Sequence, residues 1–153
     1  GGISPGGFLA RAERRWPLRM SGRSAVADST IVNLYYAELD RAVRFWRDGL
    51  GFAVVLDQGW AKLLRLADRS FLGLVDGSRG HLRPQPTSAV LVTLVVEDLS
   101  GWRERARTAG AAGITEIERR DDLAIERFFC RDPGGYALEF QRFLRPADRE
   151  AFH

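Results

Sequence analysis

The sequence contains very few of the residues that build disulfide frameworks and metal sites. Cys130 is its single cysteine, which excludes a disulfide within the chain and fits a reducing, cytoplasmic compartment. Its two histidines are His81 and His153. Lys62 is the only lysine, so arginine carries almost all of the positive charge, which we interpret as the coding bias of a GC-rich bacterial source.

Long apolar runs and basic stripes are missing as well. No apolar run reaches the roughly 20 residues that span a bilayer, and residues 1–20 lack the apolar stretch of a secretory signal. The net charge is +3, and residues 1–28 supply all of it, because five arginines there face only Glu13 and Asp28. The remaining residues are neutral overall, so we expect neither a membrane nor a nucleic acid as a partner.

A turn followed by an alternating strand stands out near the end of the chain. Asp132-Pro133-Gly134-Gly135 has the residues of a tight turn, in which proline presets φ and glycine accepts positive φ. From Tyr136 onward, large apolar residues alternate with small or polar ones, which predicts a strand with two different faces. Glu139 lies in the middle of this strand, so its carboxylate faces either water or a cavity.

One order of elements occurs twice, which is the signature of an internal repeat. A strand, a helix and three strands are predicted at 31–36, 39–48, 52–57, 60–66 and 71–75. The same order follows at 90–96, 99–109, 114–118, 124–131 and 136–143. In this alignment Asp68 to Leu74 lies over Asp132 to Glu139. We therefore predict an α+β fold of two tandem βαβββ modules, residues 30–76 and 89–143, that form a single domain over residues 30–143.

The ends of the chain lie outside this repeat. Residues 1–29 are expected to form an arm and linker, in which the spacing of Phe8 and Trp16 predicts one short helix. Met20 is typical of a native start, which leaves open whether residues 1–19 belong to the natural protein. Residues 144–153 are expected to form a C-terminal tail.

Three segments carry a family resemblance. AELDRAVRFWRDGLGF (37–52), VVEDLSGWRERARTAG (95–110) and RDPGGYALEF (131–140) resemble the glyoxalase/bleomycin-resistance, or vicinal oxygen chelate, superfamily. The resemblance implies that both modules curve a mixed sheet around a cavity and that two chains pair as a homodimer. It does not identify an activity, because the superfamily includes metal-dependent enzymes and metal-free drug-binding proteins.

The resemblance also allows a test for a metal centre. Metal-dependent members place His or Glu ligands on the first and fourth strands of each module. The matching positions here are Ile31, Leu74, Leu91 and Glu139. One carboxylate among three apolar side chains cannot hold a divalent ion, which needs three or four N, O or S donors. We therefore expect no metal and no other cofactor.

Strand alternation predicts which side chains line the cavity if Glu139 points inward. The expected ligand-binding residues combine apolar and aromatic groups with a few polar ones, as is usual for small-molecule sites. They are Asn33, Tyr35, Trp60, Lys62, Leu72, Leu74, Leu91, Thr93, Phe129, Glu139 and Gln141. Simple structural roles are the alternative for several of them, and for Glu139 this is an ion pair with Arg127 or Arg142. For the strand at 60–66, alternation allows either the face of Trp60 and Lys62, which we favour, or that of Ala61, Leu63 and Arg65.

Two functions from different classes are compatible with these residues. The first is a binding protein that sequesters an apolar or aromatic small molecule and so confers resistance to a drug or metabolite. Because residues 29–153 are neutral, a bleomycin-like cation is a poor candidate for the ligand. The second is a metal-independent lyase or isomerase with Glu139 as general base. A module that serves only as a scaffold is a third alternative, and the sequence favours binding because it shows no catalytic constellation.

Overall fold

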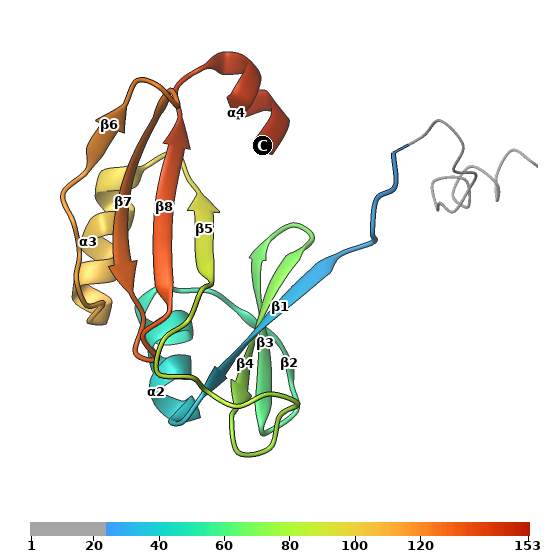
Figure 1. Ribbon diagram of the computed structural model, residues 1–153. Helices are drawn as coiled ribbons and strands as arrows, with labels where there is room; N and C mark the ends of the chain where they lie inside the picture. Colours follow the sequence, from blue (N-terminus) through green and yellow to red (C-terminus); the bar gives the residue numbers. More distant parts are fainter. Residues whose placement is uncertain (1–23) are drawn as a thin grey trace, which may run out of the picture. The chain divides into compact units, whose positions relative to one another are not determined.

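Two four-stranded sheets with the same strand order form the framework of the fold (Figure 1). The computed structural model describes residues 24–153. The chain divides into two units, residues 1–30 and 31–153, and the description below concerns the second. The helix expected between Phe8 and Trp16 lies outside the described residues.

Each module has a helical segment between its first and second strands. The first contains β1 (Thr30–Tyr36), helix α2 (Leu39–Val43), π-helix η1 (Arg44–Gly49), β2 (Val54–Asp57), β3 (Ala61–Ala67) and β4 (Ser70–Asp76). The second contains β5 (Leu91–Val95), α3 (Leu99–Ala109), β6 (Glu118–Arg120), β7 (Ile125–Arg131) and β8 (Ala137–Phe143), and helix α4 (Pro146–Phe152) follows. The strand orders are β1-β4-β3-β2 and β5-β8-β7-β6, so the predicted α+β fold of two tandem modules is confirmed.

The sequence explains where the main helix of the second module begins and ends. The carboxylate of Asp98 accepts a hydrogen bond from the amide of Gly101 at 3.0 Å, which caps the start of α3. Gly110 ends it in the left-handed conformation, with φ of 91°. None of the helices among residues 24–153 is long and apolar enough to cross a membrane.

The helix of the first module departs from the expected regular form. It begins as an α-helix, but from Arg44 it widens into the π-helix η1, and the amide of Leu50 bonds to the carbonyl of Phe45 at 2.8 Å. The wider turn accompanies the burial of Phe45, Trp46 and Leu50 in the core. Helical periodicity predicts this segment but not the local change of pitch.

The predicted strand at residues 114–118 is wrong in position. The regular strand there is β6 at Glu118–Arg120, and the preceding residues run irregularly beside β7. Thr115 explains the difference, because its hydroxyl accepts the amide hydrogen of Phe129 at 2.8 Å, a bond that a backbone carbonyl makes in a regular ladder. The amide of Thr115 bonds in turn to the carbonyl of Phe129 at 3.0 Å.

One hydrophobic core is shared by the two modules. Residues from both sheets and from α2, η1 and α3 contribute to it. A row of stacked rings connects the modules, from Phe52 to Trp102 and on to Phe140 with centroids 5.5 Å apart at each step. Phe128 continues the row at 4.9 Å from Phe140. The rings bury large apolar areas and their packing joins the modules.

The first sheet differs from the sequence alignment by one residue. Leu72 and Leu74 are fully buried in this core, so their predicted place in the cavity is wrong. The β3–β4 hairpin turns at Asp68 and Arg69, between Ala67 and Ser70, whereas five residues separate Arg131 from Ala137 in the β7–β8 hairpin. The unequal turns shift the alignment by one residue, and in a strand such a shift moves every side chain to the opposite face.

Candidate functional site

Each sheet has one face that packs on the core and one that does not, which we call its open face. Residues that pair across neighbouring strands project to the same face. On the second sheet, Thr93 pairs with Glu139, and Glu139 pairs with Phe129. The open face of that sheet therefore carries Leu91, Thr93, Val95, Arg127, Phe129, Glu139, Gln141 and Phe143.

The open face of the first sheet follows from the corresponding pairs. Leu63 lies opposite Gly73, as Phe129 lies opposite Glu139. A Cβ atom on Gly73 would overlap the side-chain oxygen of Asn33. Gly73 therefore occupies the place that Glu139 has in the second sheet, and Asn33 the place of Thr93. This open face carries Ile31, Asn33, Tyr35, Ala61, Leu63, Arg65, Phe71, Gly73 and Val75.

Glu139 is buried at the centre of the second open face, with 5 % of its surface exposed. The hydroxyl of Thr93 donates a hydrogen bond to its Oε1 atom at 2.8 Å. The Nη1 atom of Arg127 lies 3.5 Å from its Oε2 atom, so the ion pair with Arg127, which was the alternative to a free cavity carboxylate, is present. Arg142 does not take part, because it bonds to Glu126 at 2.5 Å.

Arg127 connects two carboxylates and an aromatic ring. Its Nε atom bonds to Glu118 at 2.9 Å, which is closer than its contact with Glu139. Its guanidinium carbon lies 4.9 Å from the centroid of the Phe129 ring, within the range of a cation–π contact. The guanidinium is therefore held mainly by Glu118 and Phe129, and it contacts Glu139 more weakly.

The structure places some of the predicted site residues on the open faces and others on the core side of the first sheet. Asn33, Tyr35, Leu91, Thr93, Phe129, Glu139 and Gln141 lie on the open faces. Lys62 pairs with Leu74, so it lies on the core side of the first sheet, and its expected direction is wrong. Its ammonium group bonds to Asp57 at 2.9 Å. Alternation alone allowed either face of β3, and the pairing with β4 decides between them.

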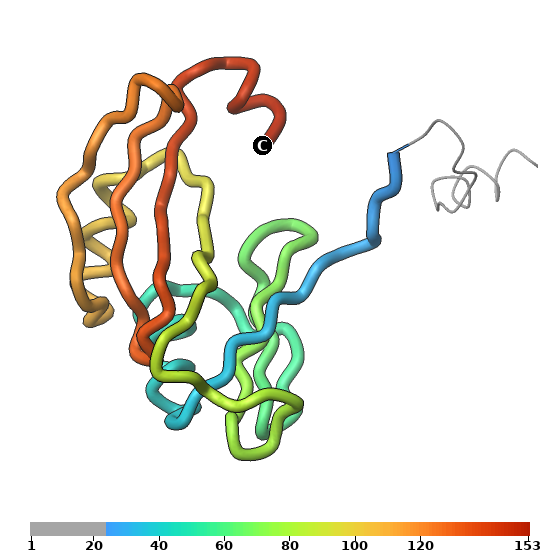
Figure 2. The backbone as a smooth tube through the Cα atoms, viewed as in Figure 1, coloured from blue at the N-terminus to red at the C-terminus, as the bar shows by residue number. Residues whose placement is uncertain are grey.

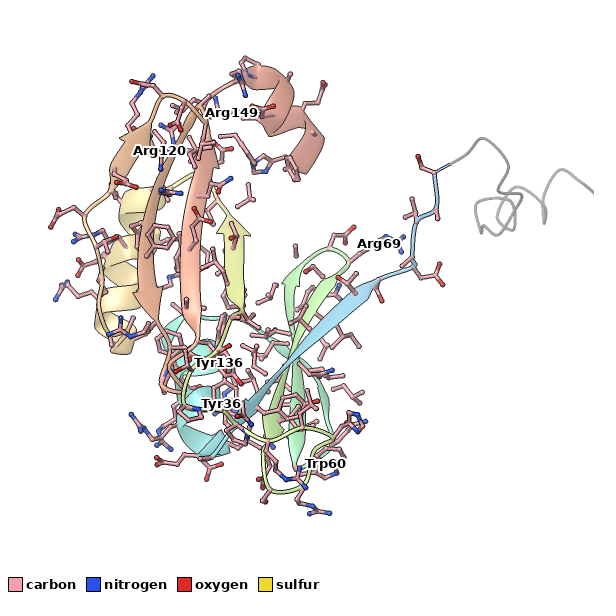
Figure 3. The ribbon with its side chains drawn as sticks, in the orientation of Figure 1. Tyr36, Trp60, Arg69, Arg120, Tyr136 and Arg149 are labelled. Carbon is pink, nitrogen blue, oxygen red and sulfur yellow. The ribbon has the colours of Figure 1, made fainter. Side chains whose placement is uncertain are left out.

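Trp60 also lies away from the open face. It directly precedes β3, at the end of the β2–β3 hairpin (Figure 3), and is two residues before Lys62. Its side chain therefore projects to the same face as that of Lys62. The guanidinium of Arg79, in the loop after β4, lies 5.9 Å from its ring. Trp60 and Lys62 therefore do not contribute to the site around Glu139 on the second open face.

The residues of the open faces do not fit a metal ion. Once the alignment is corrected, the four positions that would carry ligands are Ile31, Gly73, Leu91 and Glu139. Glycine has no side chain to offer, and Glu139 already engages Thr93 and Arg127. Within residues 24–153 no group of three or more His, Cys, Asp or Glu side chains is arranged to hold an ion.

A buried polar cluster that sequence reasoning missed joins the two modules. The hydroxyl of Tyr36 and the indole nitrogen of Trp46 both donate to Oδ2 of Asp132, the latter at 3.0 Å. The amides of Gly134 and Tyr136 donate to its Oδ1 atom, each at 2.9 Å. The turn motif predicted the backbone bonds of Asp132, but no signal pointed to the two aromatic donors.

The electrostatics of this cluster follow from its burial. Burial raises the pKa of Asp132, although the four hydrogen bonds that it accepts act in the opposite direction. Burial and the neighbouring carboxyl also raise the pKa of Tyr36. Burial raises the pKa of the nearby Cys130 thiol to about 11, so this thiol is an unreactive core residue.

The ring of Tyr136 supports the same junction. Its hydroxyl donates to the carbonyl of Tyr35 at 2.9 Å and accepts from the amide of Tyr35 at 3.0 Å. It meets the ring of Tyr36 edge to face, with centroids 5.4 Å apart, and Figure 3 shows both tyrosines where the two modules meet. This cluster is structural, since its polar atoms are occupied by one another.

Solved structures with this fold come from several bacteria. A glyoxalase/bleomycin resistance protein/dioxygenase from Nocardioides is 15% identical, covers 88% of this chain and 95% of its own, and has a TM-score of 0.65. TioX from Micromonospora sp. ML1 is 22% identical over 77% of this chain and 100% of its own, with a TM-score of 0.61. Lactoylglutathione lyase from Agrobacterium tumefaciens is 21% identical over 80% and 96%, with a TM-score of 0.60. At these identities the likeness concerns the fold alone.

Sequence comparison identifies the family but no curated relative. No curated protein matches this sequence. Residues 29–140 match the family described as the Glyoxalase/Bleomycin resistance protein/Dioxygenase superfamily, which covers both sheets up to the middle of β8. The chain belongs to the Glyoxalase/Bleomycin resistance protein/Dioxygenase superfamily.

Proposed function

We propose that the protein binds a small amphipathic molecule on the open face of its second sheet, without a metal and without catalysing a reaction. The state of Glu139 carries this proposal. It is a buried carboxylate with one hydrogen bond of 2.8 Å and one long ion pair of 3.5 Å. A carboxylate has about four lone-pair positions, and buried polar groups ordinarily find partners, so Glu139 has capacity for a donor from a ligand.

The charges around Glu139 favour a ligand with hydrogen-bond donors. Glu118 and Glu139 are both paired with the single guanidinium of Arg127, so this group of three side chains is negative overall. Arg127 bonds more closely to Glu118 and can remain there while a ligand approaches Oε2 of Glu139. A hydroxyl, amide or ammonium group suits this position, whereas a carboxylate or phosphate would be repelled.

The surroundings of Glu139 favour an apolar or aromatic body for the same ligand. Phe129 lies directly opposite Glu139, and Leu91 is half exposed on the adjacent strand, at 49 %. A ring that stacks against Phe129 would bury apolar area that is now in contact with water. The expected biological role is the sequestration of a drug or metabolite of this class.

The same contacts argue against Glu139 as a general base. Within residues 24–153, the side chains that Glu139 bonds to are Thr93 and Arg127, and neither is a general acid that could return a proton to a product. A binding role needs neither a proton transfer nor a second acid.

A second copy of the chain is proposed to complete the binding site. Ile31 and Leu91 hold equivalent places at the starts of β1 and β5, and both are about half exposed, at 48 % and 49 %. Leu56 is equally exposed, at 48 %. Apolar side chains at sheet edges and open faces are commonly covered by a partner subunit, so we propose a homodimer.

The test measures binding of simple aryl compounds to the full chain by isothermal titration calorimetry. Benzylamine and 4-phenylbutylamine carry a donor, and benzoate and 4-phenylbutyrate are their acidic counterparts. We expect the amines to bind and the acids not to bind. Glu139→Gln should weaken amine binding by about 1–3 kcal/mol, and Phe129→Ala should weaken it through lost ring contact.

A matched control and an enzymatic outcome complete the design. Glu116→Gln changes an exposed carboxylate paired with Arg103, away from the open face, and should leave binding unchanged. If every probe binds equally to wild type and Glu139→Gln, the proposed site is wrong. If a carbonyl substrate is turned over and Glu139→Gln lowers the rate by roughly 10²-fold with little change in affinity, the lyase or isomerase alternative replaces binding.

A further inference from the structure

Helix α4 lies in the segment expected to form a C-terminal tail, and its position suggests a role in the site. Pro146 occupies its first turn and Asp148 follows, both of which favour a helix start. The side chain of Arg145 bonds to Asp148 at 2.9 Å. Figure 2 shows the chain turning back after β8 into α4, on the side of the second sheet away from α3.

Two attachments hold α4 to the second module, one on β8 and one on the loop between β5 and α3. The ring of Phe152 stacks on the ring of Phe143 with centroids 4.9 Å apart and planes 18° apart. Arg149 bonds to one oxygen of Glu97 at 2.8 Å, and His153 lies 3.0 Å from the other. Arg149, labelled in Figure 3, lies in the middle of α4, whereas Phe152 and His153 lie at its C-terminal end.

These attachments are few for a helix of this size. None of its residues is buried, and 63 % of the surface of Phe152 is exposed. A helix of seven residues is not stable without tertiary contacts. Loss of either attachment should therefore release α4 while the sheet beneath it keeps its core.

Phe143 places α4 at one end of the candidate site. Phe143 shares the open face with Gln141 and Glu139, and it lies four residues along β8 from Glu139. At about 3.3 Å per residue, the two side chains are roughly 13 Å apart along the strand. Ile125, which pairs with Phe143, is buried although it lies on the open face.

The first module closes the same end of its open face in a different way. There the loop after β4 bends back, and the amide of Gly77 bonds to the carbonyl of Tyr36 at 2.8 Å. A Cβ atom on Gly80 would come within 2.6 Å of Val75 and 2.7 Å of Tyr35, so this loop is tightly packed. The first module is thus closed by a loop in close contact with its sheet, and the second by a lightly held helix.

We propose that α4 is a releasable strap whose Phe152 closes the candidate site at Phe143 and thereby limits the length of the ligand that the site accepts. Glu97 fastens the strap through Arg149 and His153. With the strap in place, a ligand anchored at Glu139 can extend about 13 Å along β8 before it meets the ring pair. The limit on ligand length depends on the proposed function, whereas the fastening of α4 does not.

Hydrogen–deuterium exchange of the full chain tests the fastening without any ligand. In Glu97→Gln and in Phe152→Ala, amide exchange in residues 149–153 should rise by about tenfold or more, while residues 137–143 keep their protection. Glu116→Gln, an exposed carboxylate away from α4, should change neither segment. Equal exchange of α4 in wild type and both variants would overturn the strap.

Phenylalkylamines of increasing length test the limit on the ligand. Wild type should bind benzylamine, 4-phenylbutylamine and 8-phenyloctylamine. Each increase in ligand length should raise its affinity by less than the one before. The substitution Phe152→Ala should raise the affinity for 8-phenyloctylamine about tenfold more than it raises the affinity for benzylamine. If Phe152→Ala raises the affinity for all three amines equally, α4 does not limit the length of the ligand. If none binds to any variant, the proposed function fails, and the exchange experiment still decides whether α4 is fastened through Glu97.

Discussion

The hydroxyl of Tyr36, at the end of β1, donates a hydrogen bond to the carboxylate of Asp132, which lies 96 residues further along the chain in the turn before β8. Trp46 donates to the same oxygen from the π-helix, at 3.0 Å. The turn that introduces the strand of Glu139 is therefore anchored to the first module. The orientation of the candidate site depends on this contact between modules.

Removal of the Tyr36 hydroxyl should destabilise the protein measurably. In Tyr36→Phe the carboxylate of Asp132 loses one of its buried donors, which ordinarily costs about 1–3 kcal/mol. Urea unfolding followed by tryptophan fluorescence measures the change. Tyr35→Phe is the control, since its hydroxyl makes no hydrogen bond within the described residues, and it should change the free energy of unfolding much less. Equal effects of both substitutions would contradict the role assigned to Tyr36.

Asp132 should make the stability of wild type depend on pH in a particular direction. Its pKa is raised in the folded state, so the unfolded chain, with a value of about 4, loses its proton first as the pH rises. The contribution of Asp132 to stability is therefore fully present below pH 4 and declines as the pH rises toward the folded value. The variant Asp132→Asn lacks this pH-dependent contribution to stability.

Unfolding of both proteins between pH 3.5 and 7 measures this difference. The stability of wild type relative to Asp132→Asn should fall as the pH rises from about 4, by up to roughly 1.4 kcal/mol per pH unit. A difference that stays constant, or grows with pH, would show that the pKa of Asp132 is not raised in the folded protein.

Divalent metal ions should not contribute to stability. The four positions that would hold an ion offer Glu139 as their only carboxylate, and it is engaged by Thr93 and Arg127. EDTA should therefore leave the thermal unfolding midpoint unchanged, and added Zn²⁺ or Ni²⁺ should not raise it. Metal analysis that finds one tightly bound ion per chain, lost together with stability, would refute this expectation.

The proposed homodimer should depend on the exposed residue Ile31. Light scattering at micromolar concentration should give about twice the chain mass of 17.1 kDa. Ile31→Lys places a charge where an apolar contact is expected, and it should yield a monomer with nearly unchanged stability. Leu82→Lys alters an equally exposed leucine in the connection between modules and should remain dimeric. A wild-type monomer would remove the proposal.

Local patterns in the sequence determined the elements and the repeat. Helical spacing predicted α3 at its observed bounds, because periodicity acts within a few neighbouring residues, and the capping bond of Asp98 and the left-handed Gly110 explain those bounds. Alternation along β8 placed Glu139 and Gln141 on one face for the same reason. The repeated order of elements predicted the α+β fold, and the resemblance of three segments indicated the family.

Tertiary structure alone decided the register of β4 and which side chains of β3 face the core. Leu74 was assigned to the cavity through an alignment that crossed two turns of unequal length, and a single residue of error reverses every side chain in a strand. Gly73, which has no side chain, occupies the position in β4 that corresponds to Glu139 in β8. Pairing with β4 likewise places Lys62 on the core side, which alternation within β3 could not decide.

Contacts between distant segments were equally beyond the sequence. The partners of Asp132 and of Glu97 lie in other elements, and no local pattern encodes which donor reaches a given carboxylate. Helix α4 is too short to form from its own propensity, so its presence depends on Phe143 and Glu97. The helices and most strands could be predicted from the sequence because they depend on neighbouring residues, whereas register, face and closure of the site depend on packing between strands that are far apart in the chain.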